Sequence, residues 1–276
     1  MEVDRDTVGA VPLRVGAVSY LNTKPLVHRL GEFAPQATLS FDLPSRLADD
    51  LAADRVDVAL IPSIEMFQDP AYSIVSDACI ACRGPVLSVK LFSRVPVKRI
   101  RTLALDEGSR TSAALVRILL KHRHDLEPLL EPLPIGCSLA DTSADAVLLI
   151  GDRAIHSPVG EFAAVWDLGD EWSRWTGLPF VFAMWTARAG VALRGIDVAL
   201  GAARDAGLAD LSTIAERESA HLGLTVPECL GYLRDNLHFY YGQQERRGLQ
   251  LFYQYAAELD LAPLGVDLGL DHCQTA

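Results

Sequence analysis

Small polar side chains stand at several points where a short apolar run of the sequence ends. Ser19 and Asn22 follow the first run, Ser63 follows a later one, and Ser88 comes shortly after Gly84-Pro85. Hydroxyl and amide groups of this kind can hydrogen-bond to the carboxylates and hydroxyls of a ligand. The same residue types are also favoured at turns and helix caps, so each position taken singly has a structural explanation.

A second polar group lies further along the chain and consists of Ser109, Arg110, Thr111, Ser112, Gly151 and Asp152. Its first four members stand where a helix is predicted to begin, and helix N-termini attract anions through free N–H groups. Arg110 can pair with a ligand carboxylate or, equally, with the adjacent Asp106 or Glu107. Lys24 is the other charged candidate. Together the two groups predict a site for a small anionic ligand.

The sequence lacks the common signatures of nucleotide and metal enzymes. It contains no G-x-x-x-x-G-K-[ST], no G-x-G-x-x-G, no H-E-x-x-H and no G-x-S-x-G. The seven histidines show no metal-ligand spacing. Cys79 and Cys82 form a lone C-x-x-C, which we interpret as thiols packed in a strand like small hydrophobes. We therefore expect neither a metal nor any other cofactor.

Composition narrows the class of protein further. The chain has 276 residues, is 50% hydrophobic and carries a formal net charge of −11, which argues against a nucleic-acid groove. No uncharged stretch is long enough to span a bilayer. Residues 1–12 have no apolar core of a signal peptide, and five cysteines without a regular framework suggest reduced thiols. We expect a cytoplasmic protein with a small-molecule ligand, and its oligomeric state stays open.

The first polar group is expected at one edge of a parallel sheet. Residues 13–18, 38–43 and 56–61 read as strands, and helices are predicted to begin at Pro25 and at Pro44. This βαβαβ alternation implies parallel strands, whose carboxyl ends face the ligand.

A second set of elements follows and then returns to the first. Strands are predicted at 102–105 and 146–150, a helix at 113–121, a further helix at 170–175 and a return strand at 180–185. The remaining chain is predicted to be helical, over 195–206, 211–221, 226–237 and 243–259. The aromatic residues of this region are predicted to pack in the core or between lobes; they are Trp172, Trp175, Phe180, Phe182 and Trp185.

This order of elements predicts a two-lobed α/β fold with a double crossover between the lobes. The first lobe is expected to comprise residues 13–97 and 184–265, and the second residues 98–183. Residues 1–12 and 266–276 are expected to be flexible ends.

Five motifs together resemble a known family. The opening V-G-A-V-S-Y-L-N-T-K-P-L, residues 15–26, resembles the first-strand motif of the menaquinone-pathway enzyme family that includes chorismate dehydratase. Later motifs of that family follow in the same order: G-P-V-L-S at 84–88, S-R-T-S at 109–112, L-I-G-D at 149–152 and W-T-G-L-P-F-V-F at 175–182. The resemblance extends from about residue 13 to residue 260.

The resemblance implies a fold similar to type II periplasmic binding proteins, used for catalysis in the cytoplasm. The implied reaction is the dehydration of chorismate to 3-[(1-carboxyvinyl)oxy]benzoate, a carbon–oxygen lyase reaction. By the same resemblance, Asn22 and Ser88 are the catalytic residues and hold a substrate carboxylate. Our hypothesis for the mechanism is an E1cB elimination in which the enolpyruvyl carboxylate of the substrate is the base.

Two other functions remain open at this point. The sister family that makes 1,4-dihydroxy-6-naphthoate shares the fold, although S-Y-L-N-T-K-P and S-R-T-S favour the dehydratase. A non-catalytic protein that binds small anions would also have this fold, and the missing signal peptide counts against it.

Overall fold

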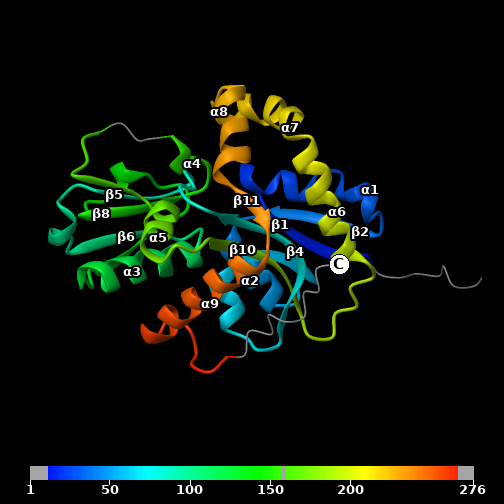
Figure 1. The fold of residues 1–276 in the computed structure, drawn as a ribbon, viewed down its shortest axis with the longest axis horizontal. Helices are drawn as coiled ribbons and strands as arrows, with labels where there is room; N and C mark the ends of the chain where they lie inside the picture. The colour runs from blue at the N-terminus through cyan, green and yellow to red at the C-terminus, as the bar shows by residue number, and fades with distance from the viewer. Residues whose placement is uncertain (1–11, 157–159, 267–276) are drawn as a thin grey trace, which may run out of the picture.

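The computed structural model describes residues 12–156 and 160–266, which form two separate mixed sheets (Figure 1). The first sheet has the strand order β11-β4-β10-β3-β1-β2. Its strands are β1 (Leu13–Val18), β2 (Ala37–Asp42), β3 (Val58–Pro62), β4 (Tyr72–Cys82), β10 (Phe180–Arg188) and β11 (His238–Tyr240). Strand β1 is parallel to both β2 and β3, which confirms the predicted parallel unit, whereas β10 is antiparallel to β3 and β4.

The second sheet has five strands in the order β7-β6-β8-β5-β9. They are β5 (Val89–Ser93), β6 (Thr102–Asp106), β7 (Leu129–Leu133), β8 (Ala146–Ile150) and β9 (Ala164–Asp167). Strands β6, β7 and β8 are parallel, and β5 is antiparallel to β8 and β9. The two-lobed α/β fold with a double crossover is confirmed, since the chain leaves the first sheet after β4 and returns to it at β10.

The chain changes sheets at other points than the sequence predicted. It crosses at residues 83–88 and again at 177–179, instead of after residues 97 and 183. Strand β5 was expected in the first lobe, but it pairs with β8 and β9. The start of β10 was expected in the second lobe, but Phe180 pairs with Cys82 of β4. Apolar runs of similar composition lie on both sides of each crossing, so composition does not mark the boundaries.

The helices cover the faces of both sheets (Figure 1). They are α1 (Leu30–Phe33), α2 (Pro44–Ala52), α3 (Arg110–His124), α4 (Asp152–Ile155), α5 (Leu168–Thr176), α6 (Ile196–Ala209), α7 (Leu211–Glu218), α8 (Val226–Gly231) and α9 (Gln243–Glu258). The predicted helical C-terminal part is confirmed, with one interruption by the short strand β11. Helix α6 packs on β4, and α9 contacts both β10 and α3, so α9 links the two lobes.

Burial agrees with the predicted role of the C-x-x-C pair. Cys79 and Cys82 lie in β4 at 0% and 1% exposure, and burial raises the pKa of the Cys82 thiol to about 12. Both thiols therefore pack as apolar side chains and stay protonated. None of the helices in the described ranges combines the length and hydropathy needed to cross a membrane. The expected flexible ends, apart from residues 12 and 266, lie outside the described residues.

Candidate active site

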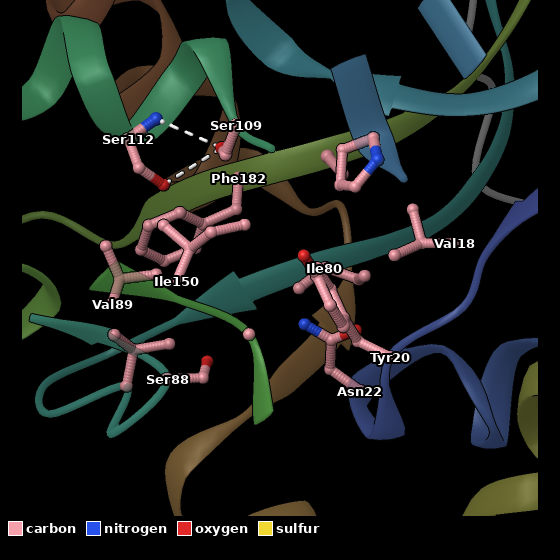
Figure 2. A pocket seen from close by; sticks show the side chains of 14 residues that line it. Val18, Tyr20, Asn22, Ile80, Ser88, Val89, Ser109, Ser112, Ile150 and Phe182 are labelled. Atoms are coloured by element: carbon pink, nitrogen blue, oxygen red, sulfur yellow. Dashed lines mark hydrogen bonds between the residues drawn. The ribbon is translucent and has the colours of Figure 1, made fainter. Parts of the chain in front are cut away.

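A pocket lies between the two lobes and takes residues from both (Figure 2). Its empty space, including the open mouth, is about 450 Å³. The lining consists of Val18, Tyr20, Asn22, Pro44, Ile80, Val86, Ser88, Val89, Ser109, Ser112, Ile150, Gly151, Phe182 and Ala183. Five predicted site residues are therefore brought together, and we call them the pocket group: Asn22, Ser88, Ser109, Ser112 and Gly151.

Asn22 stands at one end of the pocket, in a short 3-10 turn that begins directly after β1 and the extended Ser19-Tyr20. The hydroxyl of the buried neighbour Thr23 donates to Oδ1 of Asn22 at 3.3 Å. This contact helps to orient the amide, whose two N–H groups are the donors for a ligand carboxylate.

Ser88 stands at the same end, on the first crossover, and its position is held from several sides. The preceding residue, Leu87, has a left-handed φ of 59°, which is unfavourable for a side chain with a Cβ. Asp167 compensates by accepting the N–H groups of Val86 at 2.9 Å and of Leu87 at 2.7 Å. The N–H of Gly151 donates to the carbonyl of Ser88 at 2.8 Å. Strain that is held in this way is typical of functional sites.

The N-terminus of α3 forms the opposite end of the pocket, above Asn22 and Ser88 in Figure 2. Ser109 caps this helix by accepting the N–H of Ser112 at 3.3 Å, and the two hydroxyl oxygens are 3.0 Å apart. The first turn of a helix carries N–H groups without intrahelical partners and the positive end of the dipole. This end of the pocket can therefore stabilise a carboxylate without a charged side chain.

The middle of the pocket is apolar. Val18 and Ile80 lie on one side of it, and Val89, Ile150 and Phe182 lie together on the other (Figure 2). Tyr20 completes the wall, and burial raises the pKa of its phenol, so it remains neutral. Among the described lining residues none carries a charge at neutral pH. The pocket thus offers two neutral hydrogen-bonding ends separated by an apolar middle.

Four other predicted site residues bridge the two lobes, and we call them the bridging group: Ser63, Arg110, Thr111 and Asp152. Arg110 pairs with Asp49 at 2.7 Å and with Glu65 at 3.3 Å, rather than with the neighbouring acids that the sequence suggested. Thr111 accepts the N–H of Ile64 at 3.2 Å, and its hydroxyl lies 3.4 Å from that of Ser63. None of these side chains belongs to the described lining of the pocket.

Asp152, the fourth member of the bridging group, also lies outside the pocket lining, as do the candidates Ser19 and Lys24. The carboxylate of Asp152 accepts the N–H of Leu21 at 3.1 Å across the lobes, and burial raises its pKa. Ser19 is exposed. Lys24 pairs with Glu218 at 3.4 Å. In the described part of the chain, acidic, histidine and cysteine side chains form no group of three that could hold a metal.

Sequence reasoning missed the role of Tyr20 and most of the apolar wall. Phe182 was interpreted as packing, although it lines the pocket. The sequence signal for the position of Tyr20 was the glycine at 151, whose backbone has a left-handed φ of 68°. A Cβ at Gly151 would lie 2.7 Å from the Tyr20 ring, so the tyrosine can close over the pocket only because a glycine stands opposite.

The class of fold is that of periplasmic binding proteins, as solved structures show. A protein from Archaeoglobus fulgidus aligns with a TM-score of 0.68 at 15% identity, covering 91% of this chain and 99% of that chain. The periplasmic aliphatic sulphonate binding protein of Escherichia coli aligns with a TM-score of 0.61 at 15% identity, covering 95% of this chain and 92% of that chain. At such low identity these similarities establish the fold alone.

Sequence comparison identifies the family. A family model described as menaquinone biosynthesis matches residues 13–258. The chorismate dehydratase of Thermus thermophilus is 32% identical over 273 residues, covering 92% of this chain and 98% of the relative. The chorismate dehydratase of Campylobacter jejuni is 29% identical over 174 residues, covering 61% and 64% of the two chains. The chain therefore belongs to the menaquinone biosynthesis family.

Proposed function

We propose that this protein is a chorismate dehydratase, which converts chorismate to 3-[(1-carboxyvinyl)oxy]benzoate and water. The observation that carries the proposal is the pocket with two neutral hydrogen-bonding ends and an apolar middle. Chorismate matches this pattern because it has two carboxylates joined to one six-membered ring. The relatives named chorismate dehydratase support the same assignment.

Each end of the pocket suits one of the two carboxylates. The ring carboxylate fits the N-terminus of α3, where Ser109, Ser112 and the free N–H groups can stabilise added negative charge. The enolpyruvyl carboxylate fits Asn22 and Ser88. Val18, Ile150 and Phe182 then enclose the ring and exclude water from it.

The proposed reaction is a stepwise elimination. The enolpyruvyl carboxylate takes the proton from C3 of the ring, and the electron pair of the broken C–H bond spreads through the ring double bond onto the ring carboxylate. The C4–O bond then breaks, a C3–C4 double bond forms, and the ring becomes aromatic. The departing hydroxide takes the proton from the enolpyruvyl carboxyl group and leaves as water, so atoms and charge balance.

The composition of the pocket supports the substrate carboxylate as the base. The described lining contains no ionised side chain, and the nearby acids are engaged elsewhere. Asp106 pairs with Arg153 at 2.5 Å and accepts the N–H of Gly108 at 3.0 Å. Asn22 and Ser88 are neutral donors, so they can orient a carboxylate without placing beside it a positive charge, which would lower its pKa.

Incubation of the purified protein with chorismate tests the proposal. We expect a new aromatic absorbance and a product lighter than chorismate by one water in mass spectrometry. Bound but unchanged chorismate would support a non-catalytic anion-binding protein instead. Chorismate that is neither bound nor converted would leave the synthesis of 1,4-dihydroxy-6-naphthoate as the alternative.

Isotope and pH experiments test the mechanism separately. Deuterium at C3 of chorismate is expected to slow turnover if removal of that proton limits the rate. Because no lining side chain titrates near neutrality, we expect kcat to stay nearly constant from about pH 6 to 8. A steep dependence on a single ionisation in this range would contradict the substrate carboxylate as base and indicate a protein base.

A further inference from the structure

A buried tyrosine lies behind the Asn22 and Ser88 end of the pocket. Helix α8 runs directly into a π-helical turn, Tyr232–Asn236, and such turns are frequent at functional sites. The ring of Tyr232 is 2% exposed. Nδ2 of Asn236 donates to the carbonyl of Pro85 at 3.0 Å, which ties this turn to the crossover that carries Ser88.

The buried hydroxyl of Tyr232 forms no hydrogen bond with a described residue, although the side chains of Ser88 and Asn22 are near enough to influence it. Burial raises the pKa of Tyr232, whereas the adjacent side chains of Ser88 and Asn22 both lower it. Buried hydroxyl groups are nearly always paired, so an unpaired one beside a ligand pocket indicates a bond that forms when the ligand is present.

We propose that Tyr232 is a positioning residue that joins Asn22 and Ser88 into one hydrogen-bonded chain facing a substrate carboxylate. This inference rests on the proposed function. In the chain, one N–H of Asn22 donates to the phenolic oxygen, and the phenolic O–H donates to Oγ of Ser88. The second N–H of Asn22 and the hydroxyl hydrogen of Ser88 are then both directed at the carboxylate.

The count of donors and acceptors supports this arrangement. Oδ1 of Asn22 already accepts from Thr23, so its amide nitrogen is the group available to Tyr232 and the ligand. A serine hydroxyl has a single hydrogen, and that hydrogen stays available to the ligand when the neighbouring group donates to the serine oxygen instead of accepting from it. The phenol is such a group. Burial raises the pKa of Tyr232, which favours the protonated phenol that this arrangement requires.

The arrangement orients the carboxylate through neutral donors and places no positive charge beside it. Hydrogen bonds in a chain polarise one another, so each donor that faces the ligand becomes stronger without any added charge. A lysine or arginine in place of the phenol would hold the carboxylate more tightly but weaken it as a base.

The substitution Tyr232→Phe, made with and without Ser88→Ala, tests the proposal. We expect Tyr232→Phe alone to lower kcat on chorismate about 10-fold, the loss that one hydrogen bond of this kind causes. In the Ser88→Ala background the same change should cost about 2-fold or less, since the chain is already broken. Tyr241→Phe is the matched control, because Tyr241 is 1% exposed and lies outside the lining of the pocket.

Two results would overturn the proposal. One is full activity of Tyr232→Phe, and the other is an equal loss in both backgrounds, which would indicate a purely structural effect. If Tyr232→Phe unfolds, 3-fluorotyrosine at position 232 provides the second test. It keeps the ring and hydroxyl and is expected to retain activity within about 3-fold, so a larger loss there would also contradict the proposal.

Calorimetry with the product, 3-[(1-carboxyvinyl)oxy]benzoate, separates this inference from the proposed function. If the wild-type protein binds the product but does not convert chorismate, the proposed function fails. Tyr232 is then still tested by whether Tyr232→Phe weakens binding only when Ser88 is present. If the wild-type protein neither binds the product nor converts chorismate, both the proposed function and the proposed role of Tyr232 are contradicted.

Discussion

The pocket group and the bridging group consist of similar residues in neighbouring positions, yet they face different partners. Within the first turn of α3, Ser109 and Ser112 line the pocket, whereas Arg110 and Thr111 contact the other lobe. Positions three apart share one face of a helix, and the positions between them point elsewhere. One S-R-T-S motif therefore contributes both to the pocket and to the contacts between the lobes. A polar side chain is therefore available to a ligand only where no distant segment of the chain already satisfies its hydrogen bonds.

The largest effect is expected from substitutions within the pocket group. Ser88→Ala and Asn22→Ala should each lower kcat/KM on chorismate by roughly 10²–10³-fold, because each removes a donor that positions the carboxylate base against the C3 proton. Thermal unfolding should change little. Ser19→Ala is the control, since Ser19 lies on the same turn but is exposed. Near-wild-type kcat/KM in both variants would show that these residues do not hold the substrate.

Gly151 belongs to the pocket group but also supports contact between the lobes. Gly151→Ala should lower the free energy of unfolding by about 2 kcal/mol, since φ is positive and Tyr20 occupies the space of the new Cβ. Gly177→Ala is a matched control: its φ is 70°, but no atom lies within 4 Å of its Cβ position. An equal loss of unfolding free energy in the two variants, measured by urea unfolding, would mean that Tyr20 moves aside without an energetic cost.

A smaller effect is expected for the bridging group. Thr111→Val keeps the shape of the side chain but leaves the buried N–H of Ile64 without its acceptor. We expect about 1 kcal/mol of lost stability and a fall in Tm of a few degrees. The activity of the folded variant should stay within about 3-fold of wild type. A loss of activity as large as that of Ser88→Ala would place Thr111 in the pocket group instead.

The smallest effect concerns Asp152 and depends on pH. Burial raises the pKa of Asp152, so the folded protein holds this proton more tightly than the unfolded chain does. Its contribution to stability is therefore full below the unfolded pKa of about 4 and is lost as pH rises through the folded pKa. Asp152→Asn should be slightly more stable than wild type at pH 7, with the gain vanishing near pH 4. Urea unfolding at several pH values measures it, and a gain that grows toward acid pH would contradict the assignment.

The first sheet and the helical C-terminal part were predictable because their elements carry strong local patterns. Apolar runs that end in proline or small polar residues marked β1 and β3, and helical spacing marked α9. Strands β7, β9 and β11 were missed. All three are edge strands: β7 and β9 have exposed residues such as Leu129 and Val165, and β11 is only three residues long.

The site was predictable in its location but not in its detail. The polar turns lie at the expected edges of both sheets, since parallel strands fix where their carboxyl ends meet. The bridging role of Arg110 could not be predicted from the sequence. Its partners Asp49 and Glu65 are 61 and 45 positions away, and only the folded chain brings them near. Tyr232 was missed for the same reason: its neighbours lie more than a hundred positions earlier in the chain.

The absence of ionised side chains from the described lining of the pocket has a consequence for how fast substrate arrives. The chain carries a net charge of −11, and chorismate is a dianion, so their long-range interaction is repulsive. No charged lining residue focuses the field toward the mouth of the pocket. Added salt screens this repulsion within a Debye length of about 10 Å at 0.1 M, so encounter becomes faster as ionic strength rises, the reverse of electrostatic steering.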